Sequence, residues 1–245
     1  MIIDILTVAS KELREILTFG GDTRGRGKYS LLILVGVFGV IFPLQSGREW
    51  VTSAMSIMVW GWMPFLWVSG IVSDMFAGER ERHTLEALLA TRLSDQSILF
   101  GKILAALTYG VSLTWLVLLS SIVTINIVHG KDGLLFYPLA ITVSALVFSI
   151  LVSGLSASIG VLVSLRASSV RQAQQTMSIG MLVLFLPFML LQFIPKTWTE
   201  TAINLMENIQ PMQVGIGLAV VLLIVEVILI AIAMRLFQRS KLILD

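Results

Sequence analysis

Six long runs of apolar residues follow one another along the chain, each with few or no charges inside it. The runs cover about residues 29–46, 51–73, 103–128, 134–165, 176–194 and 212–234. A helix needs about 20 such residues to cross the hydrocarbon core of a bilayer, and helices satisfy every backbone polar group within lipid. The pattern therefore predicts an all-α integral membrane protein whose residues 29–245 form a domain of six transmembrane helices.

The segment 1–28 has a helical period of its own. Its apolar side chains share one side of a helix drawn at about 100° per residue; they are Ile2, Ile5, Leu6, Ala9, Leu13, Ile16 and Leu17. Polar side chains occupy the opposite side, namely Asp4, Thr7, Lys11, Arg14 and Glu15. This pattern predicts an amphipathic helix that lies in the membrane interface. A soluble helix packed on a partner subunit fits the same pattern.

Composition supports the membrane assignment and narrows the possible chemistry. The chain has 245 residues, of which 56% are hydrophobic and 13% are charged, whereas soluble domains carry about 25% charge. Six crossings leave no room for a globular domain of about 100 residues or more, so any soluble enzymatic activity must come from a partner. The absence of cysteine excludes disulfides, thiolate metal sites and cysteine nucleophiles.

The basic residues alternate between many and few from one connection to the next. The amino end and the second connection hold five and four, the fourth connection and the tail hold two and three, and the remaining connections hold one each. Fourteen of the 17 therefore lie on one side, which the positive-inside rule makes cytoplasmic. This distribution predicts a multi-pass protein of the cytoplasmic (inner) membrane with both termini in the cytoplasm. Arg24, Arg26 and Lys28 are expected to meet anionic lipid head groups.

Two catalytic interpretations fail on the residues themselves. A phosphate-binding loop before Lys28 would need glycine where Asp22 stands and a small hydroxyl where Tyr29 stands. The serines of the fourth run lack a base, because the two histidines, His83 and His129, fall on opposite sides of the membrane. The small residues of the fourth run have a spacing that is typical of close helix packing; they are Ser149, Ser153, Ser156, Ala157, Gly160 and Ser164. No catalytic, cofactor-binding or metal-binding residue is predicted in this chain.

Glu226 is the acidic residue deep inside a predicted span, where a buried charge is costly and usually functional. Three roles stay open for this intramembrane candidate. It can bind a cationic substrate, pair across a dimer, or remain protonated in a packed interface.

The second cytoplasmic connection contains the most informative segment, Glu79 to Leu93. Leu85, Leu88, Leu89 and Leu93 recur at helical spacing, and charged residues cover the other side. The pattern predicts one amphipathic helix, with Arg82 and Glu86 four residues apart and able to pair, followed by Ser94 as the N-cap of the next helix. The leucine stripe fits a partner's surface or this protein's own helices, and the pattern does not choose between them.

Residues 77–94 (AGERERHTLEALLATRLS), followed by Gly101 and Lys102, closely resemble the signature of ABC-2 type permeases, the membrane subunits of ABC exporters. The chain departs from that signature at His83, where glycine is usual, and at Arg92, where proline is usual. The resemblance implies that this segment is a coupling helix that docks on a separate ATP-binding cassette subunit. The implied contact residues are Glu79, Arg80, Arg82, Leu85, Glu86, Leu88 and Leu89. The fifth connection, residues 192–210, would correspond to external helices that dip toward the membrane.

The resemblance and the span pattern together predict the permease subunit of an ATP-driven exporter. Such a subunit forms the transmembrane pathway as a homodimer or with a similar permease, within membrane lipid and without nucleic acid. ATP and magnesium would bind the partner subunit, and no cofactor is expected in this chain. The alternative is a secondary carrier or channel that works without an ATPase, and the cargo is not readable from the sequence.

Overall fold

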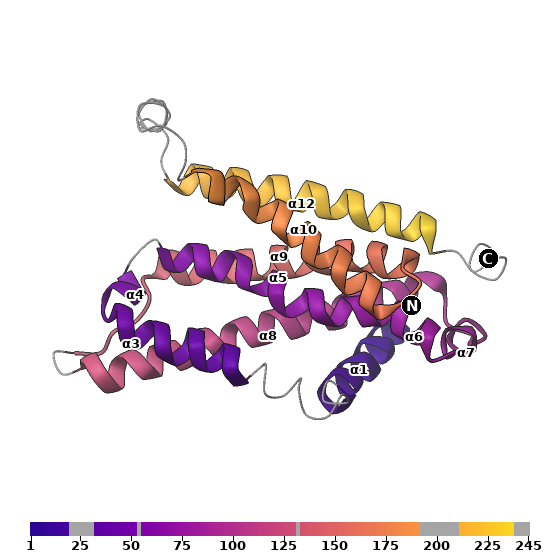
Figure 1. The fold of residues 1–245 in the computed structure, drawn as a ribbon, viewed down its shortest axis with the longest axis horizontal. Coiled ribbons are helices and arrows are strands. Elements are labelled where there is room, and N and C mark those ends of the chain that lie inside the picture. The colour runs from indigo at the N-terminus through magenta and orange to yellow at the C-terminus, as the bar shows by residue number, and fades with distance from the viewer. Residues whose placement is uncertain (20–31, 53–54, 131–132, 192–210, 238–245) are drawn as a thin grey trace.

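The computed structural model describes residues 1–19, 32–52, 55–130, 133–191 and 211–237, and within these ranges the chain forms helices and no strand (Figure 1). Three of the described helices are long and apolar enough to cross a membrane: Asp95–His129, Leu139–Arg166 and Met212–Leu236. The all-helical prediction is confirmed over the described residues, and the count of six spans stays a prediction. The fifth connection, the basic residues at 24–28 and the tail beyond residue 237 lie outside the described ranges.

The first half of the chain contains one polar-faced helix and several apolar ones. The helices of this half are α1 (Ile2–Phe19), the apolar segment Leu32–Ser46 with a π-helical turn η1 (Val37–Ile41) and α3 (Phe42–Ser46), then α4 (Glu49–Thr52) and α5 (Met55–Met75). Gly47, with φ of +59°, ends α3. Glycine suits this place because left-handed backbone is costly for residues with a Cβ atom.

The second half contains the three longest helices, and local capping sets where they begin. They are α8 (Asp95–His129), α9 (Leu139–Arg166) and α12 (Pro211–Leu236), with α10 (Val170–Leu191) between the last two. The predicted N-cap is confirmed, because the Ser94 hydroxyl accepts a hydrogen bond from the Ser97 amide at 3.1 Å. Helix α9 begins at residue 139, because Pro138 occupies its N-cap position. Helix α10 begins at residue 170, where the Ser169 hydroxyl accepts a hydrogen bond from the Gln172 amide.

Helix α9 lies at the centre of the bundle and packs against α5, α8, α10 and α12. The small side chains that the sequence assigned to helix packing are buried there: Ser149, Ser153, Ser156, Ala157, Gly160 and Ser164. The Cβ of any other residue at position 160 would overlap Val72 of α5. The Ser156 hydroxyl donates to the Phe65 carbonyl of α5 at 3.3 Å. The predicted role of these residues in close packing is confirmed.

Three large side chains of α5 face the interior of the bundle. Trp60, Met63 and Trp67 are buried in one hydrophobic cluster with residues of α8 and α9. The Trp60 ring lies edge-on against Tyr137, with the ring centroids 6.2 Å apart. Burial of such large rings supplies much of the apolar contact that holds α5 in place.

The two ends of the bundle differ in character. Helices α1, α6 (Ala77–Glu81) and α7 (Leu85–Leu89) gather at one end, where α12 also ends, and α3 and α4 lie at the other (Figure 1). By the distribution of basic residues, the end with α6 and α7 is the predicted cytoplasmic end. The candidate site is at this end.

Candidate coupling site at the cytoplasmic end

The segment predicted as one helix from Glu79 to Leu93 is instead two short helices, α6 (Ala77–Glu81) and α7 (Leu85–Leu89). The chain breaks at His83, whose φ of +55° is left-handed. The Thr84 amide bonds the Glu79 carbonyl at 2.9 Å and the His83 amide bonds the Arg80 carbonyl at 3.1 Å, which is the Schellman pattern of a helix end. This conformation explains why glycine is usual in the signature at the position of His83.

The leucine stripe of α7 packs mainly on this protein's own helices. Leu85 and Leu89 are buried in the chain's main hydrophobic cluster, and Leu88 is half-buried against it. Of the two surfaces that the leucine stripe fits, Leu85 and Leu89 pack against this protein's own helices. The exposed side of α7 consists of Glu86 and Ala87, and it is this side that a partner can reach.

Glu79, one of the implied contact residues, also lies inside the chain. Its side chain is 7% exposed and accepts a hydrogen bond from the Lys102 ammonium of α8 at 2.9 Å. The same ammonium donates to Glu12 of α1 at 3.0 Å and to the Met75 carbonyl at 3.0 Å. Glu12 and Glu79 thus come from two different helices, α1 and α6, to one cation.

Lys102 is fully buried, and its ammonium group is fully hydrogen-bonded. Its three N–H donors have three acceptors, and the ammonium lies 5.1 Å from the centroid of the Phe76 ring. The second carboxylate oxygen of Glu79, Oε2, has no hydrogen-bond partner among the described residues. Burial raises the pKa of Glu79 above its usual value, and the Lys102 charge opposes that rise.

Arg80 and Ser164 join the coupling segment to the end of α9. The Arg80 guanidinium donates to the carbonyls of Leu165 and Ala167, which lie in the last turn of α9 and just beyond it. The Ser164 hydroxyl accepts from the amides of Phe76 and Ala77 at 3.1 and 2.9 Å and donates to the Ser73 carbonyl. Backbone groups at both helix ends, which have no partner within their own helix, are satisfied across the two elements.

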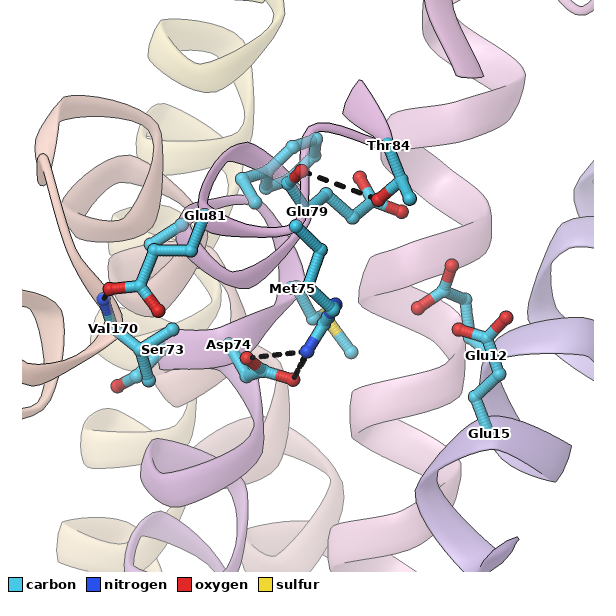
Figure 2. A network of polar contacts seen from close by, with 12 residues as sticks. Glu12, Glu15, Ser73, Asp74, Met75, Glu79, Glu81, Thr84 and Val170 are labelled. Carbon is cyan, nitrogen blue, oxygen red and sulfur yellow. Dashed lines mark hydrogen bonds and ion pairs between the residues drawn. The ribbon is translucent and has the colours of Figure 1, made fainter. Parts of the chain in front are cut away.

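Glu81 and Arg82 extend the same set of contacts to α10 and α5. The Glu81 carboxylate accepts from the Val170 amide at 2.9 Å, at the N-terminus of α10 (Figure 2), where a negative charge is favourable. Arg82 pairs with Asp74 of α5 at 3.3 Å and not with Glu86, because the break at His83 takes the two residues off a common helix face.

The residues of α6 therefore contact four other helices: α8 through Lys102, α9 through Arg80, α10 through Glu81 and α5 directly. Helix α1 is joined to the same Lys102 through Glu12. The sequence interpretation missed Glu12 and Lys102 as site residues. A signal for Glu12 exists, since it stands four residues from both Val8 and Ile16, at the edge of the apolar side of α1.

Glu226, the intramembrane candidate, is half-buried on α12 and faces α9. Its carboxylate lies against Gly154, so that a Cβ at position 154 would overlap it. The structure brings Glu226 to the small-residue surface of α9, far along the bundle from α6. Among the described residues, no group of three or more His, Asp or Glu side chains is placed to hold a metal ion.

The apolar helices and the polar helix pair at one end define a multi-pass helical membrane protein. A family model described as ABC-2 family transporter protein matches residues 65–242, so the chain belongs to that family as an ABC-2 type permease. The chain is similar to the ABC transporter permease protein NatB of Bacillus subtilis (strain 168), with 35% identity over 174 residues. That match covers 61% of this chain and 40% of the relative, so the chain spans well under half of the relative's length.

Proposed function

We propose that this chain is the membrane-spanning subunit of an ATP-driven exporter and that α6 and α7 couple it to a separate ATP-binding subunit. Family membership supports an association with an ATPase subunit. The observation that carries the proposal is the set of bonds from α6 to α8, α9 and α10, together with the bond of α1 to the same Lys102. A connection that only reversed the chain direction would not need bonds to so many other helices.

The proposed contact is the exposed side of the coupling segment. Arg82, His83, Glu86 and Ala87 are exposed there, while Glu79, Arg80, Leu85 and Leu89 hold the segment in place from inside. In this proposal the predicted contact residues have two roles, one set reaching the ATPase and the other transmitting its motion to the helices. Nucleotide binding and hydrolysis on the partner would drive alternating access of the pathway.

The proposed exporter contains two permease chains. The described part of α12 is exposed along most of its length, and its apolar side chains are available to lipid and to a second chain. The sequence contains no feature that chooses between an identical and a similar partner. The proposed topology has six spans, α1 in the membrane interface and both termini in the cytoplasm.

Substitutions on the exposed side of α7 test the coupling contact. Ala87→Arg adds a bulky cation to that surface without touching the core, and we expect it to lower co-purification of the ATPase subunit by about tenfold or more, a loss of roughly 1.4 kcal/mol. Thr52→Arg, at an exposed position of α4 at the opposite end, is the matched control and should retain the complex. If Ala87→Arg binds the ATPase normally, or if transport persists without any ATPase, the coupling proposal is wrong and a carrier or channel is favoured.

The topology is tested by cysteine labelling, since the chain has no native cysteine. Single cysteines on the predicted outer side should react with an impermeant reagent in intact cells, at positions Ser46, Lys131 and Lys196. Cysteines on the predicted inner side should react only after permeabilisation, at positions Arg26, Arg92 and Ser240. Labelling of position 92 from outside would contradict the predicted orientation, because Arg92 lies on the side that holds 14 of the 17 basic residues and is therefore predicted to be cytoplasmic.

A further inference from the structure

Gly101 and Lys102, adjacent residues near the start of α8, both contact α1. A Cβ at position 101 would lie 2.5 Å from the Val8 Cβ and 3.0 Å from the Ile5 carbonyl oxygen, distances that real side chains do not adopt. Glycine therefore permits α1 to cross α8 with backbone close to backbone. One residue further, Lys102 bonds Glu12 on the next turn of the same face of α1.

The Lys102 ammonium is also the anchor of α6, so α1 and the coupling segment are bonded to a single atom. Glu12 and Glu79 both accept from it, at 3.0 and 2.9 Å, and all three groups are buried. If Glu79 moved away from Lys102 alone, it would be left as an unpaired charge in a low-dielectric site. If Glu12 did so, it would keep only the half-exposed Lys11, 3.4 Å away at the surface. The two helices are therefore expected to shift together.

A simple membrane anchor would not need this arrangement. Anchoring requires an apolar edge, which α1 has in Ile2, Ile3, Leu6 and Leu17, all strongly exposed. A buried carboxylate in the opposite, α8-facing surface adds nothing to lipid binding. Glu12 is accounted for by its bond to Lys102, which joins α1 to the element that contacts the ATPase in the proposed function.

We propose that Lys102 is a positioning residue that makes α1 part of the coupling unit, so that α1 moves with α6 when the ATPase binds nucleotide. Gly101 sets the contact surface and Glu12 provides the link. This inference rests on the proposed function, because it assumes that the ATPase acts on α6 and α7. It assigns a mechanical role to a helix that the sequence pattern places merely at the membrane surface.

The test uses single cysteines as spectroscopic reporters in the reconstituted complex of permease and ATPase. Ser10→Cys places a spin label on the exposed side of α1, and Ala87→Cys places one on α7. In otherwise unchanged chains, we expect ATP to alter the spectra of both labels. Adding Glu12→Gln should abolish the response on α1, keep the response on α7 and ATPase co-purification, and lower the amount of cargo transported per ATP hydrolysed.

Glu15→Gln is the matched control, the same chemical change three residues away on a half-buried side chain of α1, and it should leave both responses intact. Gly101→Ala is the second variant, because it displaces α1 without removing a charge, and it should behave as Glu12→Gln does. An α1 label that responds equally with and without Glu12→Gln overturns the inference, as does an α1 label silent in the unaltered chain while the α7 label responds. A chain that never binds the ATPase overturns the proposed function itself.

Discussion

Replacing Lys102 with methionine is expected to lower the melting temperature of the purified permease by roughly 6 to 20 °C, far more than a surface substitution. The reason is that methionine fills a similar volume but leaves the buried Glu79 without a cation and leaves Glu12 with only the half-exposed Lys11. Removing one partner of a buried ion pair costs about 3 to 5 kcal/mol, and each kcal/mol shifts the melting temperature of a chain of this length by about 2 to 4 °C. Thermal unfolding followed by tryptophan fluorescence in detergent measures the change.

Two further variants separate the loss of charge pairing from the loss of packing. Lys11→Met, the same change at a half-exposed lysine beside Glu12 and Glu15, should shift the melting temperature by no more than a few degrees, since exposed ion pairs contribute about 0 to 1 kcal/mol. Combining Lys102→Met with Glu12→Gln and Glu79→Gln removes the unpaired charges and should recover much of the stability. A Lys102→Met protein that melts like the unaltered chain would show that the network contributes nothing to the fold.

Substituting Gly110 with leucine prevents α5, α8 and α9 from packing together. A Cβ at this position would lie 2.5 Å from Val68 of α5 and 2.6 Å from the Ser153 hydroxyl of α9, and both of those side chains are fully buried. Overpacking of a buried site commonly costs about 1 to 3 kcal/mol, and here there is no solvent-facing direction in which leucine can turn. We expect a cost at or above the upper end of that range, seen as a loss of monodisperse protein in size-exclusion chromatography.

Gly70→Leu is the matched control for this substitution. Gly70 lies on α5, two residues from Val68, but nothing lies within 4 Å of the position that its Cβ would take. The same increase in side-chain volume should therefore be tolerated there. Equal yields of folded Gly110→Leu and Gly70→Leu protein would contradict the close packing of the three helices.

The helical architecture was predictable because it follows from local properties of the chain. The apolar runs, the Ser94 cap and the small residues of α9 all depend on spacing and residue type. The structure confirms the cap and the buried small residues, and it gives three of the runs as helices long enough to cross a membrane. The signature of residues 77–94 likewise led to the correct family. The starts of the long helices were less accurate, because caps such as Pro138 and Ser169 set where a helix begins, and not the apolar run. The fourth run starts five residues before α9, and the fifth starts six residues after the first residue of α10.

The coupling segment shows where local pattern stops being sufficient. Leucines at helical spacing predicted one helix from Glu79 to Leu93, but the helix period does not reveal the left-handed residue at His83 that divides it. The pattern also could not say which surface buries the leucines. Leu85 and Leu89 pack within the chain because α5, α8 and α9 leave an apolar surface beside them, and this surface is built from residues distant in sequence.

By itself, the sequence determined that this protein is helical, apolar and of the ABC-2 family, because hydrophobic period, charge distribution and a short signature are local quantities. Only the tertiary structure decided that Glu79 is an internal residue and that Glu12 binds the same lysine, Lys102. Glu79 is 23 positions from that lysine in the sequence, and Glu12 is 90 positions from it. A buried ion pair of this kind depends on the distance between helices. That distance is set by close approaches such as Gly101 against Val8, which no single stretch of sequence contains.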